Sequence, residues 1–451
     1  MRLIISCGGT GGHFNPGLGI ARYVNSHDGE SLLILGGPHA PKQLVTASES
    51  GVKAQSFRYE RPGKNPVQIL KFFFAVIRGY RFAKKMIREF KPDAMLIMGS
   101  SVSLPAALAA RRMKLPIFLH DGNARVGKAN RFLSRWAKAI ALSFPAANAE
   151  TLRCKSVLTG LPLREPLLAP PISKAEAVAR FNEMYGTDFD AAKPLMLVFG
   201  GSLGAQKINE CFDADPSDPA VKDLQVIMLT GPGKLEEMQK LHADFPGKIC
   251  LREASPEMHT IYSACDVVIS RSGGSTVSEL AYFGKYALLI PYPFAAELHQ
   301  NDNAAYLASG GGAEILMNED VTRERMREFV SRFLADRGGC IAKGEQSKRL
   351  AFPDAGRGLS RYCPGLCGWQ YRCWLCHPGD EHSRLRNHLP DRGPSFGGTS
   401  QGTPAGGAKA HHRCTAFWRT FHQPDGKQQS GRPPGAGSRR GSGGSQVYRQ
   451  G

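Results

Sequence analysis

The sequence predicts an α/β fold made of two parallel β-sheets, each covered by helices on both faces. From residue 1 to about 350, short apolar runs alternate with longer amphipathic stretches. The runs are apolar throughout, as in strands that are buried on both faces. LIISCGGTGG near the start and LMLVFGGSLGAQ near the middle both join a strand to a helix through a glycine loop. This internal echo predicts two Rossmann-like domains that face each other across a cleft.

Nine apolar runs are the predicted strands. They span residues 2–6, 31–36, 94–99, 116–120 and 139–143 in the first half, and 195–200, 225–231, 266–270 and 287–292 in the second. Each run is followed by glycine, polar residues or a helix-like segment, as a βαβ rhythm requires. The proline-bearing stretch 158–173 separates the two series. We therefore expect one domain at residues 1–160 and another at 161–355.

The composition predicts a globular chain of the cytoplasm. No apolar run approaches the roughly 18 residues that cross a bilayer, and the first residues lack a secretory pattern. Six cysteines lie among apolar residues without a pairing pattern, which is typical of reduced thiols: Cys7, Cys154, Cys211, Cys250, Cys265 and Cys340. Of the net charge of +19, +10 falls on residues 357–451. The rest of the chain is basic to an ordinary degree, so no specific nucleic-acid partner is predicted.

The last segment, residues 356–451, differs in composition from everything before it. Residues 357–451 include 18 Gly and 8 Pro but no Ile or Met, and 12 Arg against 2 Lys. Such a composition buries too little apolar area to offset the entropy of ordering the chain. Two interpretations stay open, a disordered tail and the out-of-frame product of a translational frameshift.

A glycine loop follows the first strand. Glycines occupy positions 8, 9, 11 and 12, with Thr10 among them and His13 directly after. Bare backbone here lets N–H groups approach a phosphate, which the next helix N-terminus also favours. The spacing fits neither Gly-x-Gly-x-x-Gly, because Phe14 stands where the third glycine belongs, nor a P-loop. We expect phosphate binding, with a tight turn as the alternative.

His13 is expected in the first turn of the helix that follows this loop. A helix N-terminus disfavours the imidazolium, so the ring stays neutral and available as a base near pH 7. The alternative is a histidine that is satisfied by a nearby carbonyl.

Two more glycine loops occupy the corresponding places of the second half. In FGGSLGAQKIN, residues 199–209, Ser202 and the amides around Gly204 are placed to bind a phosphate. In SRSGGSTVSE, residues 270–279, the donors before the next helix are Ser272, Gly273, Gly274, Ser275 and Thr276. Both loops therefore predict anion binding in the second domain.

Polar side chains follow the third loop. Glu279, one turn beyond it, suits two ribose hydroxyls, although a capping-box glutamate would give the same pattern. HQNDNAAYL places His299, Gln300 and Asn303 at the start of another helix. Such side chains suit sugar hydroxyls, and a plain N-terminal cap is the alternative.

The stretch 65–93 is amphipathic and basic. Its large apolar side chains alternate with cations: Ile69, Leu70, Phe73, Phe74, Ile77, Tyr80 and Phe82 with Lys71, Arg78, Arg81, Lys84, Lys85 and Arg88. An apolar face ringed by cations suits an anionic membrane surface. A core-packed helix with a solvated basic face is the alternative.

No metal site is predicted. The two Asp-x-Asp patterns, at 188–190 and 213–215, adjoin no glycine loop. The cysteine and histidine cluster at 363–377 matches the spacing of no common zinc module. We therefore expect no essential cofactor.

Five motifs occur in order with the spacing of the MurG family, which the chain resembles over residues 1–355. They are GGTGGHFNPGLGIA, HDGNARVGKANRFLSRWAKAIALSF, GGSLGAQKIN, RSGGSTVSELAYFGKYALLIPYP and HQNDNAAYL. The resemblance implies a GT-B glycosyltransferase that moves N-acetylglucosamine, with inversion, from UDP-N-acetylglucosamine to the muramoyl 4-hydroxyl of undecaprenyl-diphosphate-linked muramoyl-pentapeptide. This product is lipid II, so the resemblance also implies a role in peptidoglycan synthesis, cell shape and cell division, at the inner face of the membrane.

The resemblance also assigns residues. On the acceptor side it implies Thr10, Gly11, Gly12, His120 and Asn123, with His13 and Asp121 as catalytic residues. On the donor side it implies Arg164, Ser202, Ser272, Gly273, Thr276, Glu279, His299 and Gln300.

The sequence differs from the family's motifs at four places. One is the segment MGSSVSLP. At the other three, this chain has GLP where the family has Gly-Asn-Pro, GGSLGA where it has Gly-Gly-Ser-Gln-Gly-Ala, and HDGN where it has His-Glu-Gln-Asn. Three alternatives remain. They are a UDP-sugar transferase with another lipid or natural-product acceptor, a sugar-nucleotide epimerase, and a member made inactive by its altered C-terminal closing segment.

Overall fold

The computed structural model describes residues 1–59, 65–201 and 204–355, which all belong to one compact unit. The predictions for the tail at 356–451 and for Ser202 lie outside these residues.

The first sheet has seven strands, all parallel, in the order β3-β2-β1-β4-β5-β6-β7. The strands are β1 (Arg2–Gly8), β2 (Glu30–Gly36), β3 (Lys53–Phe57), β4 (Ala94–Ile97), β5 (Ile117–Asp121), β6 (Ala139–Leu142) and β7 (Lys155–Leu158). The strand order reverses between β1 and β4. Ligands of open α/β sheets bind at the carboxyl ends of the strands beside such a reversal.

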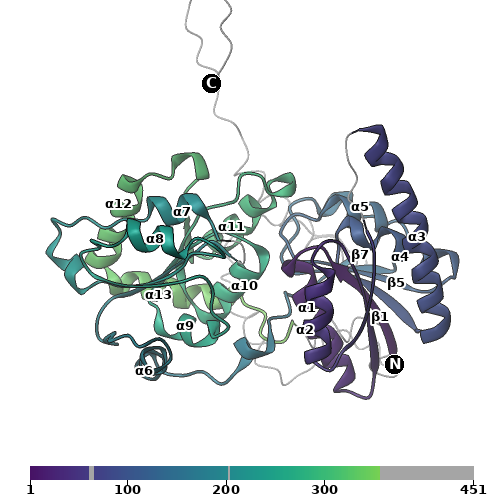
Figure 1. Ribbon diagram of the computed structural model, residues 1–451, viewed down its shortest axis with the longest axis horizontal. Helices are drawn as coiled ribbons and strands as arrows, with labels where there is room; N and C mark the ends of the chain where they lie inside the picture. Colours follow the sequence, from purple (N-terminus) through teal and green to yellow (C-terminus); the bar gives the residue numbers. More distant parts are fainter. Residues whose placement is uncertain (60–64, 202–203, 356–451) are drawn as a thin grey trace, which may run out of the picture. The chain divides into compact units, whose positions relative to one another are not determined.

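Helices cover both faces of the first sheet (Figure 1). Alternate residues of β1 point to opposite faces, because side chains alternate along a strand. Leu3 and Ile5 pack with α1 (Gly11–Asn25) and α2 (Ala40–Glu49). Ile4, on the other face, belongs to a core that includes residues of three helices: α3 (Pro66–Phe90), α4 (Leu104–Arg112) and α5 (Lys128–Leu133).

The second sheet has six parallel strands in the order β10-β9-β8-β11-β12-β13. They are β8 (Leu195–Phe199), β9 (Gln225–Leu229), β10 (Lys248–Arg252), β11 (Val267–Ser270), β12 (Tyr286–Leu289) and β13 (Ala313–Ile315). Here the order reverses between β8 and β11, so the glycine loops after these two strands lie at the same edge of the sheet.

The second sheet is also covered on both faces. One core contains residues of α6 (Lys174–Tyr185), α9 (Met258–Ala264), α10 (Gly274–Phe283) and α11 (His299–Ser309). The other contains residues of α7 (Gln206–Cys211), α12 (Arg323–Ala335) and α13 (Arg337–Ser347). A short helix, α8 (Leu235–Leu241), precedes β10. The predicted α/β fold class is confirmed; the predicted domain boundaries at 160 and 355 stay predictions.

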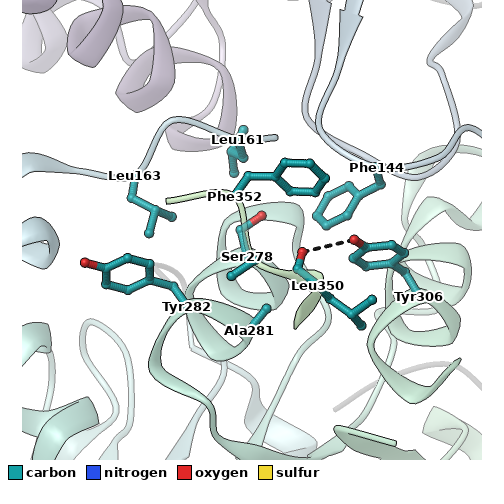
Figure 2. Close-up of a pocket in the computed structure, with 10 residues that line it drawn as sticks. Phe144, Leu161, Leu163, Ser278, Ala281, Tyr282, Tyr306, Leu350 and Phe352 are labelled. Atoms are coloured by element: carbon teal, nitrogen blue, oxygen red, sulfur yellow. Dashed lines mark hydrogen bonds between the residues drawn. The ribbon is translucent and has the colours of Figure 1, made fainter. Parts of the chain in front are cut away.

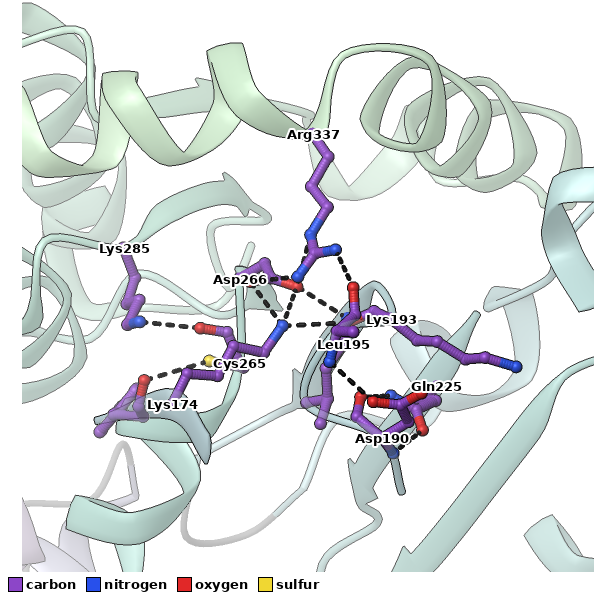
Figure 3. A network of polar contacts seen from close by, with 11 residues as sticks. Lys174, Asp190, Lys193, Leu195, Gln225, Cys265, Asp266, Lys285 and Arg337 are labelled. Atoms are coloured by element: carbon purple, nitrogen blue, oxygen red, sulfur yellow. Dashed lines mark hydrogen bonds and ion pairs between the residues drawn. The ribbon is translucent and has the colours of Figure 1, made fainter. Parts of the chain in front are cut away.

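A buried carboxylate ties three parts of the second domain together (Figure 3). Asp266, 5% exposed, precedes β11. Its oxygens accept from Lys174 Nζ on α6 at 2.7 and 2.8 Å and from Leu195 N at the start of β8 at 2.9 Å. Arg337 Nε, at the start of α13, lies 3.2 Å away. This cluster lies at the amino-terminal edge of the sheet, opposite the glycine loops.

After α13 the chain passes beside residues of the first domain (Figure 2). Tyr306 Oη donates to Leu350 O at 3.0 Å. Phe352 packs on Gly160, whose φ of +78° suits glycine and where a β-carbon would overlap Phe352. Phe352, Phe144 and Leu161 together line a small cavity of about 10 Å³. The segment 350–352 therefore contacts residues of both domains.

Candidate functional site

The first glycine loop has the geometry of an anion site at a helix N-terminus. β1 ends at Gly8, and Gly8 and Gly9 have φ of +120° and +83°, values that suit glycine. Helix α1 begins at Gly11 after the extended N-cap Thr10, whose side chain does not cap the helix. Instead, Thr10 Oγ1 lies 3.0 Å from His13 Nδ1. The first N–H groups of α1 are thus oriented for an incoming anion.

His13 is placed in the first turn of α1, as predicted, in surroundings that keep it neutral. Its ring lies against the backbone of Gly99, where a β-carbon would be 3.2 Å from His13 Cδ2. Burial, and secondarily the proximity of His299, lower the pKa of His13 from 6.5 to about 4. Since Thr10 engages Nδ1, the other ring nitrogen is the one available to a substrate.

His120, predicted on the acceptor side, is buried rather than exposed at the surface of the site. It is 1% exposed at the end of β5, and its Nε2 lies 3.2 Å from Ser143 Oγ. Burial lowers the pKa of His120 to about 4, while a hydrogen bond from its ring to the backbone carbonyl of Gly160 acts to raise that pKa. His120 is therefore held in the neutral form inside the first domain, and its place on the acceptor side stays a prediction.

Asp121 organises the loop that follows β5. Its carboxylate accepts from Gly127 N at 3.0 Å, Asn130 Nδ2 at 3.0 Å and Asn123 N at 3.2 Å. Burial raises the pKa of Asp121, and these hydrogen bonds oppose the rise. These hydrogen bonds fix the Asp121 carboxylate within the loop that follows β5. Its catalytic role stays a prediction.

Asn303 links the loop after β5 to elements that carry residues predicted on the donor side. It is fully buried, and its Oδ1 accepts from Ala124 N at 2.7 Å. Its Nδ2 donates to Ser272 O at 3.0 Å and to Asn123 Oδ1 at 3.2 Å. The structure thus brings Asn123, predicted on the acceptor side, together with Ser272, predicted on the donor side.

The third glycine loop ends at the N-terminus of α10. Gly273 is the N-cap in extended conformation, without a side-chain cap, and Thr276 lies in the first turn. Ser272 Oγ donates to Gln300 O at 2.8 Å, so this hydroxyl fixes the start of α11. Because Glu279 lies well inside the helix and Gly273 caps it, the alternative of a capping-box glutamate is wrong.

Glu279 is instead a buried carboxylate with two polar neighbours. It is 7% exposed, accepts from Tyr262 Oη at 2.9 Å and lies 3.8 Å from Arg164 Nη2. Burial raises its pKa, while Arg164 and Tyr262 lower it. Two residues predicted on the donor side are therefore neighbours, and Tyr262 is a partner that sequence reasoning missed.

His299 and Gln300 begin α11, as predicted, and both contact the preceding loop. Gln300 Oε1 accepts from Tyr292 N at 2.9 Å, and His299 Nδ1 lies 2.7 Å from Ala296 O. The two residues before them, Glu297 and Leu298, both have φ of +53°. Such a conformation costs a non-glycine residue about 1–3 kcal/mol, so the surrounding contacts must hold it.

The Asp-x-Asp patterns have structural partners. Lys248 Nζ donates to Asp188 Oδ2 at 2.5 Å, and Arg327 Nη2 donates to Asp213 Oδ2 at 2.8 Å. Among residues 1–59, 65–201 and 204–355, no three His, Cys, Asp or Glu side chains are grouped to hold a metal ion. That no cofactor is essential stays a prediction.

The amphipathic stretch forms α3, capped by Asn65, whose Oδ1 accepts from Gln68 N at 2.7 Å. Five large apolar side chains in its first half are each more than 50% exposed: Val67, Ile69, Leu70, Phe73 and Phe74. Tyr80 and Phe82 were expected on this exposed face, but both pack against the core. The exposed apolar patch is therefore limited to residues 67–74. In the part of the chain that the structure describes, no helix is long and apolar enough to span a membrane.

Comparison with known proteins covers both sheets. Residues 3–142 match the glycosyltransferase family 28 N-terminal domain, and residues 195–357 match the C-terminal domain of that family. The chain is 31% identical to a UDP-N-acetylglucosamine–N-acetylmuramyl-(pentapeptide) pyrophosphoryl-undecaprenol N-acetylglucosamine transferase of Pediococcus pentosaceus, over 80% of this chain and 98% of that protein. A protein of the same name from Desulforamulus reducens is 32% identical over 79% of this chain and 96% of its own length.

Solved structures agree with these matches. The crystal structure of Acinetobacter baumannii MurG is similar with a TM-score of 0.61 and 25% identity, over 79% of this chain and 97% of that one. A UDP-N-acetylglucosamine 2-epimerase from Neisseria meningitidis has a TM-score of 0.54 at 12% identity, over 80% of this chain and 99% of that one. The similarity to the epimerase is a similarity of fold alone.

Proposed function

Because the chain belongs to the family of UDP-N-acetylglucosamine–N-acetylmuramyl-(pentapeptide) pyrophosphoryl-undecaprenol N-acetylglucosamine transferases, we propose that it transfers N-acetylglucosamine from UDP-N-acetylglucosamine to undecaprenyl-diphosphate-linked muramoyl-pentapeptide. The product is lipid II, for peptidoglycan synthesis. The observation that supports this most is that relatives of this one name align with 79–80% of the chain, across both sheets. The family and the GT-B fold that the five motifs predicted are thereby confirmed.

In the proposed reaction the acceptor oxygen displaces UDP directly. Neutral His13 takes the proton of the muramoyl 4-hydroxyl as that oxygen bonds to the anomeric carbon with inversion. The bond from this carbon to the diphosphate breaks, and its electron pair leaves with UDP. The N–H groups of Gly11 and Gly12 and the hydroxyl of Thr10 bind the acceptor diphosphate, which the helix N-terminus favours.

The donor is held by the second domain. Ser202 and the α10 N-terminus, with Ser272, Gly273 and Thr276, receive the diphosphate of UDP, and Arg164 assists. Preorganised donors of this kind stabilise the charge that develops on a leaving group, so we propose no essential metal. Glu279 accepts hydrogen bonds from the ribose hydroxyls, and His299 and Gln300 bind the sugar. His120, Asp121 and Asn123 shape the acceptor side.

A transfer assay with the purified full chain tests this function. With UDP-N-acetylglucosamine and undecaprenyl-diphosphate-linked muramoyl-pentapeptide we expect equal amounts of UDP and of disaccharide-bearing lipid. Diacylglycerol as acceptor, and UDP-glucose as donor, serve as controls and should give little product. Transfer to diacylglycerol alone would establish another lipid transferase. UDP release or epimer formation without transfer would establish a different reaction. No turnover with any pair would identify an inactive member.

We further propose that the enzyme works in the cytoplasm, bound peripherally to the inner face of the membrane through residues 65–93. The patch of residues 67–74 places large apolar side chains in water, and Lys71, Arg78 and Arg81 are exposed on the same helix. Apolar side chains that enter the lipid interface and cations that face anionic headgroups act together. The undecaprenyl chain of the acceptor lies in the same membrane. No specific nucleic acid is proposed as a partner.

Replacing both Phe73 and Phe74 by serine should weaken binding to vesicles of phosphatidylglycerol and phosphatidylethanolamine by at least about tenfold. The reason is that each phenyl ring transferred from water into the lipid contributes about 1.5–3 kcal/mol to binding. Sedimentation with the vesicles measures this. The control is Val45→Ser with Leu241→Ser, which removes two apolar side chains that are 57% and 39% exposed on α2 and α8. Equal sedimentation of the α3 variant and the control would exclude this face as the membrane contact.

A further inference from the structure

Two ion pairs join the region after β5 to the segment that carries the predicted donor-sugar residues. Arg131 Nη2 on α5 lies 2.5 Å from Glu297 Oε1, and Arg125 Nε lies 2.5 Å from Asp302 Oδ2. The partners are 166 and 177 residues apart in the sequence. Glu297 lies two residues before the start of α11, and Asp302 lies in its first turn. The two pairs therefore act on either side of His299 and Gln300.

The first pair is attached at the most constrained point of this segment. Glu297 and Leu298 both have φ of +53°, a backbone conformation that non-glycine residues adopt only when contacts hold it. Glu297 is held by Arg131, and each side chain is about 25% exposed. The next residues depend on this start, because Gln300 Oε1 accepts from Tyr292 N and Gln300 O accepts from Ser272 Oγ.

The second pair stands beside a fully buried contact. Asp302 is 4% exposed and Arg125 is half-buried. Next to them, Asn303 accepts from Ala124 N and donates to Asn123 Oδ1. The 123–125 segment and the first turn of α11 thus meet through two buried side chains, Asp302 and Asn303, whereas Glu297, which is 24% exposed, meets Arg131 nearer the surface.

We propose that Arg131 and Glu297 are positioning residues for the transfer reaction: their ion pair holds the start of α11 in the conformation that receives the donor sugar. The inference rests on the proposed function, because it takes His299 and Gln300 as donor-sugar residues. The Arg125–Asp302 pair anchors the same helix from its inner side. Arg131 and Glu297 each keep about a quarter of the side chain in water, which screens part of their attraction, so the effect of the pair is expected in substrate binding more than in unfolding.

A charge exchange tests the pair. Arg131→Glu and Glu297→Arg should each raise the KM for UDP-N-acetylglucosamine about tenfold, with a smaller change in kcat, since partners in contact couple strongly. The double variant, which restores the pair with reversed charges, should return to within about threefold of the wild-type KM. Thermal unfolding should change little in any of them.

The matched control is Glu176→Arg with Arg180→Glu, a pair of the same 2.5 Å separation on α6. These single variants and their exchange should leave KM unchanged. Single variants at 131 and 297 with a wild-type KM, or a double variant no better than the singles, would overturn the proposal.

Amide hydrogen exchange separates this inference from the proposed function. The single variants should exchange faster than wild type at residues 299–303, and the double variant should regain protection. That pattern in a chain that makes no lipid II would leave the positioning role standing and refute the function. Unchanged protection in every variant, with full transfer by the wild type, would refute the positioning role alone.

Discussion

Replacing His13 by alanine should lower kcat for transfer by about 10²–10⁴-fold, the range expected when a general base is removed. The KM for UDP-N-acetylglucosamine should change little, because the proposed donor site lies in the second domain. The reason is local: His13 stands at the N-terminus of α1 beside Thr10 and Gly99, at the carboxyl end of β1. The glycine loop that we propose as the binding site of the acceptor diphosphate would thus place the proposed base beside the acceptor sugar.

The pH profile of the wild-type enzyme gives a second measurement of the same role. A base acts only when deprotonated, and the pKa of His13 is lowered to about 4 by burial and by His299. The acid limb of kcat should therefore fall near pH 4 rather than near 6.5, and His13→Ala should lose that limb. His27→Ala, at an exposed histidine just beyond the same helix, is the control and should retain wild-type kcat. Near-normal transfer by His13→Ala would remove this residue from the mechanism and make Asp121 the next candidate.

The inner strands were predictable from sequence, and the edge strands were not. All nine predicted runs form strands, and the four that were missed are β3, β7, β10 and β13. These four stand at the edges of the two sheets. An edge strand pairs on one side only and is partly exposed, so its sequence need not be apolar. KAQSF of β3 and KICLR of β10 both begin with an exposed lysine. Periodicity detects burial, and these segments are not fully buried.

For the candidate site too, some features were predictable from the sequence and others were not. The places of His13 and of the loop at 270–276 follow from local strand–loop–helix order, which a sequence displays directly. The partners Tyr262 for Glu279 and Arg131 for Glu297 depend on contacts between distant segments. No spacing in the sequence encodes such contacts. Likewise, the helical pattern of 65–93 indicated two faces but not that Tyr80 and Phe82 pack inward, since this depends on the aromatic cluster around Phe57.

Replacing Asp266 by alanine should lower the free energy of unfolding by about 3–5 kcal/mol, the cost of removing one partner of a buried ion cluster. Lys174 and Arg337 would lose their common carboxylate, and Leu195 N its acceptor (Figure 3). Urea denaturation measures the loss. Asp188→Ala, which removes an 83% exposed carboxylate from Lys248, is the control and should leave the free energy of unfolding nearly unchanged. A similar loss in both variants would contradict a special role for the buried cluster.

If Asp266→Ala proves too unstable to purify, Lys174→Met tests the same cluster with a smaller loss of stability. The methionine keeps an apolar stem of similar length, and Arg337 remains to balance Asp266, so a loss of about 1–2 kcal/mol is expected. Asp266 lies before β11, at the sheet edge opposite the loops at 199–205 and 270–276. The folded fraction of either variant should therefore keep the wild-type kcat. A fall in kcat per folded molecule would show instead that a shift of α6 and α13 changes the site through the sheet.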